Sequence, residues 1–192
     1  HRFPNVPVTE DGHLRWDIDE LWEQMRTALS FGVFNGGFDA ISIDTWGVDF
    51  GLIGQDGQLL EKPVHYRDRR TEGMVEEVCG SIPAEELFMQ SGIQPMSINT
   101  LFQLNYLVKH EKNAIFRAEK LLMMPDLFAY FLTGECRSEF TEATRTAVCP
   151  FPRRDRRKSG GRSRSAPTSY PCPTSRNTPA PACGAAPARS RR

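Results

Sequence analysis

One stretch decides the fold, FDAISIDTWGVDF at residues 38–50. Residues 38–44 are short, apolar and β-branched, which predicts a strand buried in a sheet. Residues 48–53 continue in the same style after Gly47. In open α/β sheets, ligands bind at the loops that follow the carboxyl ends of strands. We therefore expect an α/β fold with a ligand-binding turn around Trp46 and Gly47.

The residues of this turn suit a polyol. Gly47 lets the backbone approach a ligand closely, and Trp46 offers a flat apolar face to sugar C–H groups. Asp44 and Asp49 can accept hydrogen bonds from hydroxyls. The alternative interpretation is a tight turn with a core Trp and two solvated Asp, and the residues alone leave both open.

Helical patterns surround this stretch. Asp17 and Glu20 have the spacing of a capping box at the start of a helix that runs to about Ser30. Gln55-Asp56-Gly57-Gln58 is a hairpin signal. Further helices are expected at 71–78, 81–92, from Asn99 to 108, at 114–121 and at 125–134, with a strand or extended loop at 138–148.

The net charge of zero conceals two opposite parts. Residues 1–150 carry a formal charge of −10, whereas residues 151–192 carry +10 and are dominated by Arg, Pro, Ser and Ala. Such a segment cannot bury enough apolar surface to offset its chain entropy. We expect a folded part at 1–150 and a disordered basic tail at 151–192.

Several classes of protein are disfavoured. No apolar run approaches the roughly 18 residues of a membrane span, and no signal peptide opens the chain. Five Cys without a CxxC pair indicate reduced thiols in a cytoplasmic protein. No Gly-rich phosphate loop occurs, and no segment has metal-ligand spacing, so we expect no metal site.

A second charged stretch is PVHYRDRRT at residues 63–71. Arg67, Asp68 and Arg69 could organise a site for hydroxyls or phosphates. The plainer interpretation is an ion-paired helix start, in which His65 is a structural residue rather than a base.

Five blocks in order give the chain a family resemblance. They are IDTWGVDF at 43–50, PVHYRDRRT at 63–71, SGIQPMSINTLFQL at 91–104, LLMMPDLFAYFLTGE at 121–135 and FTEATRT at 140–146. Together they resemble the FGGY carbohydrate kinases, and the first and third blocks resemble the branch of that family that acts on rhamnulose.

The resemblance implies an actin-like, ribonuclease-H-like α/β fold, of which residues 1–150 are an N-terminal sugar-binding domain that lacks its first strand. It implies ATP and Mg²⁺ as cofactors, and transfer of the γ-phosphoryl group to L-rhamnulose to give L-rhamnulose 1-phosphate in rhamnose breakdown. The family's sugar-contacting glycine matches Gly47. Trp46 and Asp49 are expected to lie on the sugar, and Asn99 and Asp126 occupy matching blocks.

The resemblance ends near residues 148–150. The turn that contacts ATP phosphates, the catalytic Asp and the C-terminal kinase domain are not recognisable in this sequence, so we expect the chain alone to be inactive. The composition of 151–192 is typical of a shifted reading frame, which sequencing the DNA across codon 150 tests. The alternative function is a non-enzymatic remnant whose basic tail binds nucleic acid or other polyanions. Without interleaved aromatics, such binding is expected to be incidental.

Overall fold

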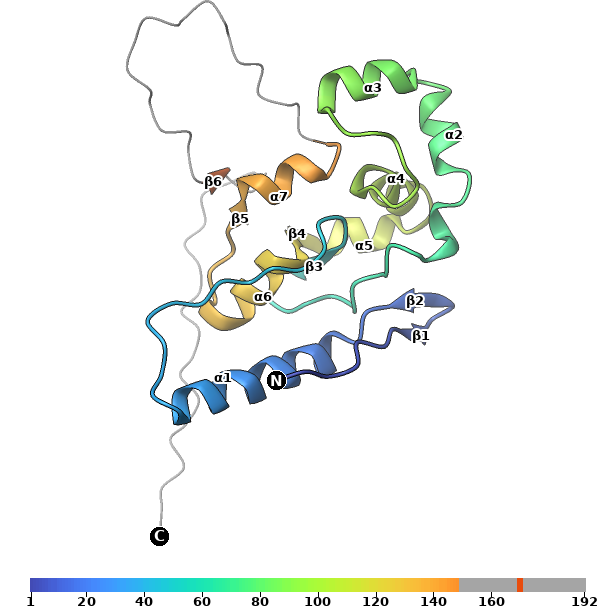
Figure 1. Cartoon of the computed structure of the whole chain (residues 1–192). Coiled ribbons are helices and arrows are strands. Elements are labelled where there is room, and N and C mark those ends of the chain that lie inside the picture. Colours follow the sequence, from blue (N-terminus) through green and yellow to red (C-terminus); the bar gives the residue numbers. More distant parts are fainter. Residues whose placement is uncertain (149–168, 171–192) are drawn as a thin grey trace, which may run out of the picture.

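The computed structural model describes residues 1–148 and the backbone of Ser169–Tyr170. Apart from those two residues, the expected basic tail at 151–192 lies outside the described residues, and so do the reading-frame and polyanion hypotheses that depend on it. The described chain mixes helices and strands, as the α/β expectation requires (Figure 1).

The helices and strands follow one another in this order: β1 (Val8–Glu10), β2 (His13–Arg15), α1 (Ile18–Phe34), β3 (Phe50–Gly54), the short 3₁₀ helix η1 (Arg69–Thr71), α2 (Met74–Cys79), α3 (Ala84–Ser91), α4 (Thr100–His110), α5 (Lys112–Arg117), β4 (Ala118–Met123), α6 (Met124–Thr133), β5 (Ser138–Glu139), α7 (Phe140–Arg145) and β6 (Ser169–Tyr170).

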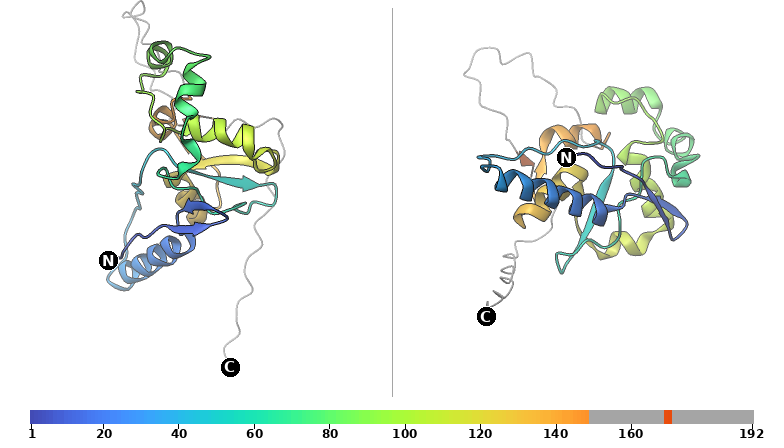
Figure 2. Two further views of the ribbon diagram at one scale, coloured as in Figure 1. Left: turned by 90° about the vertical axis from the view of Figure 1, so that its right-hand side faces the viewer. Right: turned by 60° about the horizontal axis from the view of Figure 1, so that its bottom comes forward.

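The antiparallel pair β3–β4 forms the centre of the molecule, with Phe50 opposite Met123. Side chains alternate across this pair because successive residues of a strand point to opposite faces. Ile53 and Leu122 face a core with α1 and α6, whereas Phe50 and Met123 face a core with α4. In Figure 1, α1 lies below the pair and α4 above it, and the left view of Figure 2 shows the same order from the side.

Several predicted boundaries are confirmed. The 55–58 turn closes through a hydrogen bond from Gly54 N to Gln58 O, and α3 and α6 both end at a glycine in the left-handed region, Gly92 and Gly134. The predicted capping box is wrong in detail. Asp17 makes no side-chain cap and instead accepts a hydrogen bond from Lys62 Nζ at 2.9 Å.

The predicted buried strand at 38–44 is wrong. This stretch is mostly exposed and has no regular secondary structure. Within the part of the chain that the structure describes, residues 38–48 make no backbone-to-backbone hydrogen bond. Strand pairing begins at Phe50, because β4, the strand that pairs with this part of the chain, reaches only residues Phe50 to Gly54. We refer to residues 38–48 as the open segment.

Two further predictions are corrected by burial. The helix predicted at 114–121 ends at Arg117, and β4 follows because Leu121 and Leu122 pack into different cores on the two faces of the sheet. The extended stretch predicted at 138–148 contains α7 instead. The Glu139 carboxylate stabilises its start by accepting from the backbone N–H groups of Thr141 and Glu142.

Candidate functional site

Asp49 lies at the entrance to β3 and is fully buried, with 0% of its surface exposed. Its Oδ2 accepts hydrogen bonds from Trp16 Nε1 at 2.6 Å and from Tyr66 N at 3.1 Å, and its Oδ1 accepts from Gln103 Nε2 at 2.9 Å. Burial raises the pKa of Asp49, and these donors counter part of that rise. The carboxylate therefore joins three parts of the chain that are distant in sequence.

Aromatic rings stack beside this carboxylate. The Trp16 ring lies between Trp46, at a centroid distance of 4.0 Å, and His65, at 3.9 Å. Tyr66 continues the cluster, and the Arg67 guanidinium lies 5.3 Å from the Tyr66 ring centroid. Burial is the main cause that lowers the pKa of His65, which keeps this imidazole neutral at pH 7 and suits a packed ring rather than a base.

Helix α7 packs directly over Gly47. A Cβ added there would lie 2.8 Å from Arg145 Cδ and 3.1 Å from Glu142 Oε2, so a larger residue would require these two side chains to move. Trp46 is half-buried. Its Nε1 lies near the Asp49 carboxylate and lowers the pKa of Asp49, but it makes no hydrogen bond to any described residue. The Arg145 and Glu142 side chains therefore cover the backbone of this turn at Gly47.

Asn99 and Asp126 occupy different places. Asn99 precedes α4, and its Oδ1 accepts from Met96 N at 2.8 Å, which holds the loop before the helix. Asp126 lies in the first turn of α6, where its Oδ1 accepts from Glu139 N at 3.2 Å beneath α7. The structure therefore brings Trp46, Gly47 and Asp49 together, places Asn99 on an adjoining loop, and places Asp126 behind α7.

A groove of about 510 Å³ opens next to the aromatic cluster. One wall comes from residues between Tyr66 and Glu76, and the other from the loop Pro95 to Ile98. Tyr66, Arg67, Asp68 and Ser97 supply polar groups to it. The sequence analysis singled out the charged residues of the first wall, but it assigned no site role to Tyr66 or to the 95–98 loop, although both lie in blocks that carry the family resemblance.

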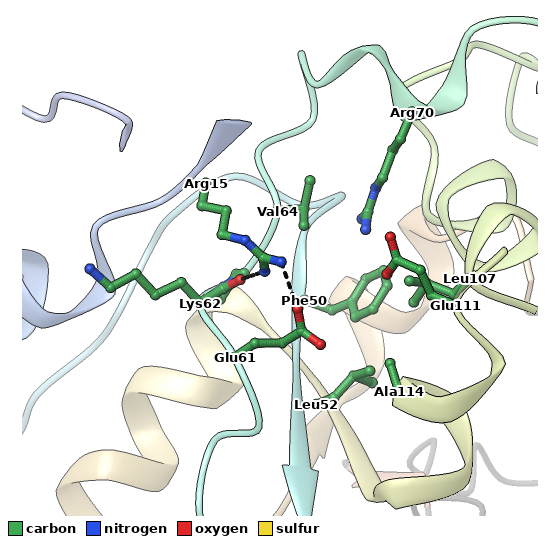
Figure 3. Close-up of a pocket in the computed structure, with 11 residues that line it drawn as sticks. Arg15, Phe50, Leu52, Glu61, Lys62, Val64, Arg70, Leu107, Glu111 and Ala114 are labelled. Carbon is green, nitrogen blue, oxygen red and sulfur yellow. Dashed lines mark hydrogen bonds and ion pairs between the residues drawn. The ribbon is translucent and has the colours of Figure 1, made fainter. Parts of the chain in front are cut away.

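A second cavity lies behind β3 and holds only about 20 Å³, room for one water molecule (Figure 3). Arg15 reaches it from β2 and donates hydrogen bonds to Glu61 Oε2 and to the Lys62 carbonyl, both at 2.6 Å. Arg70 and Glu111 approach from the opposite side. This cavity is too small for a sugar, and its charges stabilise the packing of the loop at 61–64 against β3.

In the charged stretch at 67–70, some residues stabilise the fold and others lie at the surface. Asp68 accepts hydrogen bonds from Leu14 N at 2.7 Å and from Arg70 N at 2.9 Å, so it caps η1 and anchors β2. Arg69 pairs with Glu72 on the surface. Arg67 is exposed at the groove. The ion-paired helix start is therefore present, and Arg67, whose guanidinium packs on the Tyr66 ring, lines the groove.

Comparison with known proteins identifies the class. Residues 4–155 match the N-terminal domain of the FGGY family of carbohydrate kinases. The chain belongs to this family.

Relatives in sequence and in structure agree with that assignment. The chain is 41% identical over 145 residues to a rhamnulokinase from Bacteroides thetaiotaomicron, which covers 75% of this chain and 30% of that relative. Its fold resembles a xylulose kinase from Lactobacillus acidophilus, with a TM-score of 0.67 and 17% identity over 77% of this chain and 30% of that one. It also resembles a glycerol kinase from Plasmodium falciparum, with a TM-score of 0.58 and 16% identity over 77% and 32%.

The chain spans about 30% of the length of the relatives it matches. In residues 1–148 and 169–170, no helix is long and apolar enough to cross a membrane. The same residues contain no group of three or more His, Cys, Asp or Glu side chains placed to hold a metal ion.

Proposed function

We propose that this chain is the sugar-binding part of a cytoplasmic kinase that phosphorylates L-rhamnulose to L-rhamnulose 1-phosphate in rhamnose breakdown. The observation that carries the proposal is the groove beside the Trp16–Trp46–His65 stack, in a chain 41% identical to a rhamnulokinase. A groove of this size holds a six-carbon ketose, and sugars bind to sites that combine aromatic faces with a few polar groups.

Within this proposal, Tyr66 offers a ring face to the sugar, and Arg67 and Ser97 offer hydrogen-bond donors to its hydroxyls. Gly47 contacts the ketose through its backbone once the exposed Arg145 side chain moves aside. Neither Trp46 nor Asp49 lines the groove: Trp46 packs against the Trp16 ring, and the buried Asp49 supports the groove by accepting a hydrogen bond from Tyr66 N. Asn99 shapes the loop around Met96, and Asp126 supports α7, which covers Gly47.

ATP and Mg²⁺ are the cofactors that the family implies. When bound, they supply the phosphoryl group and neutralise the charge that develops on it. The described residues contain no cluster that fits Mg²⁺, so we assign the nucleotide, the metal ion and the catalytic base to parts of a complete kinase beyond these residues. The chain alone is therefore expected to bind sugar without turning over ATP.

Calorimetric titration of the full chain with L-rhamnulose and with L-fuculose, with and without ATP, tests this function. We expect L-rhamnulose to bind more tightly, and Tyr66→Ala to weaken its binding by about tenfold, the loss of one good stacking contact. Phe116→Ala is the control, because Phe116 is 83% exposed on α5 away from the groove. Absence of sugar binding to the unmodified chain would contradict the proposal, and ATP turnover by it would contradict its inactivity.

A further inference from the structure

Gln103 has the most connected side chain near the groove, and the proposed function does not use it. It lies in the second turn of α4 and is 1% exposed. Its Nε2 lies 2.9 Å from Asp49 Oδ1, 3.1 Å from the Ile98 carbonyl and 3.2 Å from the Val48 carbonyl. Its Oε1 accepts from Arg70 Nη2 at 2.8 Å. A single amide therefore joins three separate segments of the chain.

These three segments bound the groove. Ile98 belongs to the loop that forms one wall, and Arg70 follows Tyr66 to Arg69 of the other wall. Val48 and Asp49 form the end of the turn that carries Trp46. The Asp49 carboxylate extends the connection to the first wall, because it accepts from Tyr66 N. The distance between the two walls is thus fixed through the amide of Gln103.

The chemistry requires an amide at this position. Arg70 and Asp49 lie at opposite ends of the side chain, so an acceptor must face the guanidinium and a donor must face the carboxylate. Glutamate would set a second negative charge against the fully buried Asp49. Methionine would fill the volume but leave the buried acceptors unpaired, which is costly in a dry environment.

We propose that Gln103 is the positioning residue that sets the width of the groove and, through it, the choice among ketoses. This inference rests on the proposed function for the ligand, but the connection between the walls stands on the hydrogen bonds alone. Thr100 Oγ1 also bonds to the Val48 carbonyl, at 2.8 Å, so α4 stays attached to the turn when Gln103 is replaced. Replacement should therefore loosen the walls without detaching the helix.

The test compares Gln103→Met and Gln103→Glu with Val108→Ala on the same helix, since Val108 is 53% exposed and lines neither the groove nor the small cavity. Hydrogen exchange reports the wall, through the Tyr66 amide that Asp49 holds. Titration reports the affinity for L-rhamnulose and for L-fuculose. We expect both Gln103 variants to exchange the Tyr66 amide at least tenfold faster, to bind L-rhamnulose at least tenfold more weakly and to lose preference between the sugars. Val108→Ala should change none of these.

The outcomes of this comparison separate the role of Gln103 from the proposed function. If the folded Gln103 variants keep exchange rate, affinity and preference within twofold of the unmodified chain, the inference is overturned even where Tm falls, because Gln103 is then structural only. If the unmodified chain binds neither sugar, the proposed function fails, and the exchange rate alone decides whether Gln103 couples the walls. Should both Gln103 variants fail to fold, Arg70→Lys, which weakens the bond to Gln103 Oε1 together with the contact between the guanidinium and the Tyr106 ring, is compared in the same way.

Discussion

Two carboxyl groups meet where α6 supports α7. Asp126 is 6% exposed, and its Oδ2 has no hydrogen-bond partner among the described residues; the same holds for Glu142 Oε2. Burial, reinforced by the charges of Glu142 and Glu139, raises the pKa of Asp126 from 3.8 to about 6. The protonated form of Asp126 is therefore the form that folding favours, and ionisation weakens the support for α7.

The pH dependence follows from this direction. The stability that Asp126 contributes is fully present below pH 3.8 and is lost as the pH rises through about 6. Asp126→Asn, which keeps an acceptor for Glu139 N and cannot ionise, should stabilise the chain at pH 7.5 by about 1–3 kcal/mol and change little at pH 3.5. Urea unfolding at both pH values measures this, with the exposed Asp39→Asn as control. A destabilised Asp126→Asn chain at pH 7.5 would show that the buried carboxylate is stabilised by charge.

At the scale of elements, β3 is tightly enclosed. A Cβ added to Gly51 would lie 2.8 Å from Leu59 Cδ1 and 2.9 Å from Leu127 Cδ2, so the strand is held between its return segment and α6. Gly51→Ala should cost about 1–3 kcal/mol through overpacking. Denaturant titration measures the cost, and Leu59→Ala should recover part of it in the double variant. Equal stability of Gly51→Ala and the unmodified chain would mean that the neighbours shift freely.

Elements with a local signal could be predicted from the sequence. The helices α1, α4 and α6 show apolar residues at helical spacing, and glycines mark the ends of α3 and α6. The lack of a strand at 38–44, the strand β4 and helix α7 could not be predicted. Whether an apolar run becomes a strand depends on a partner strand, and the start of α7 depends on one side chain, Glu139, that caps it.

The candidate site also has one part that the sequence predicts and one part that it does not. The turn from Trp46 to Asp49 carries its own signal, since a glycine beside an aromatic residue and a carboxylate is unusual after an apolar run. The groove does not, because its walls come from residues near 66–76 and 95–98 that only packing brings together. Gln103 stands next to the apolar stripe of a helix in the sequence. Its role depends on three distant segments.

At the scale of the whole molecule, the described chain is a compact assembly around β3–β4 with one bare length of backbone, the open segment. Large apolar side chains extend from it and from the end of α1 into solvent, Phe34 with 88% of its surface exposed and Ile41 with 48%. The two sides of this segment are nevertheless held together, because Ile18 and Leu21 of α1 pack in one core with Leu122 and Leu127.

Proteases bind their substrates as extended chains without internal hydrogen bonds, so the open segment is already in the form that they cleave. Thermolysin, which cuts before large apolar residues, should make its earliest cut within residues 1–148 at Phe38, Ile41 or Ile43. The two products should elute together as one nicked particle. Mass spectrometry of a time course locates the cut, and a first nick inside the 55–58 turn would show that this backbone is shielded in solution.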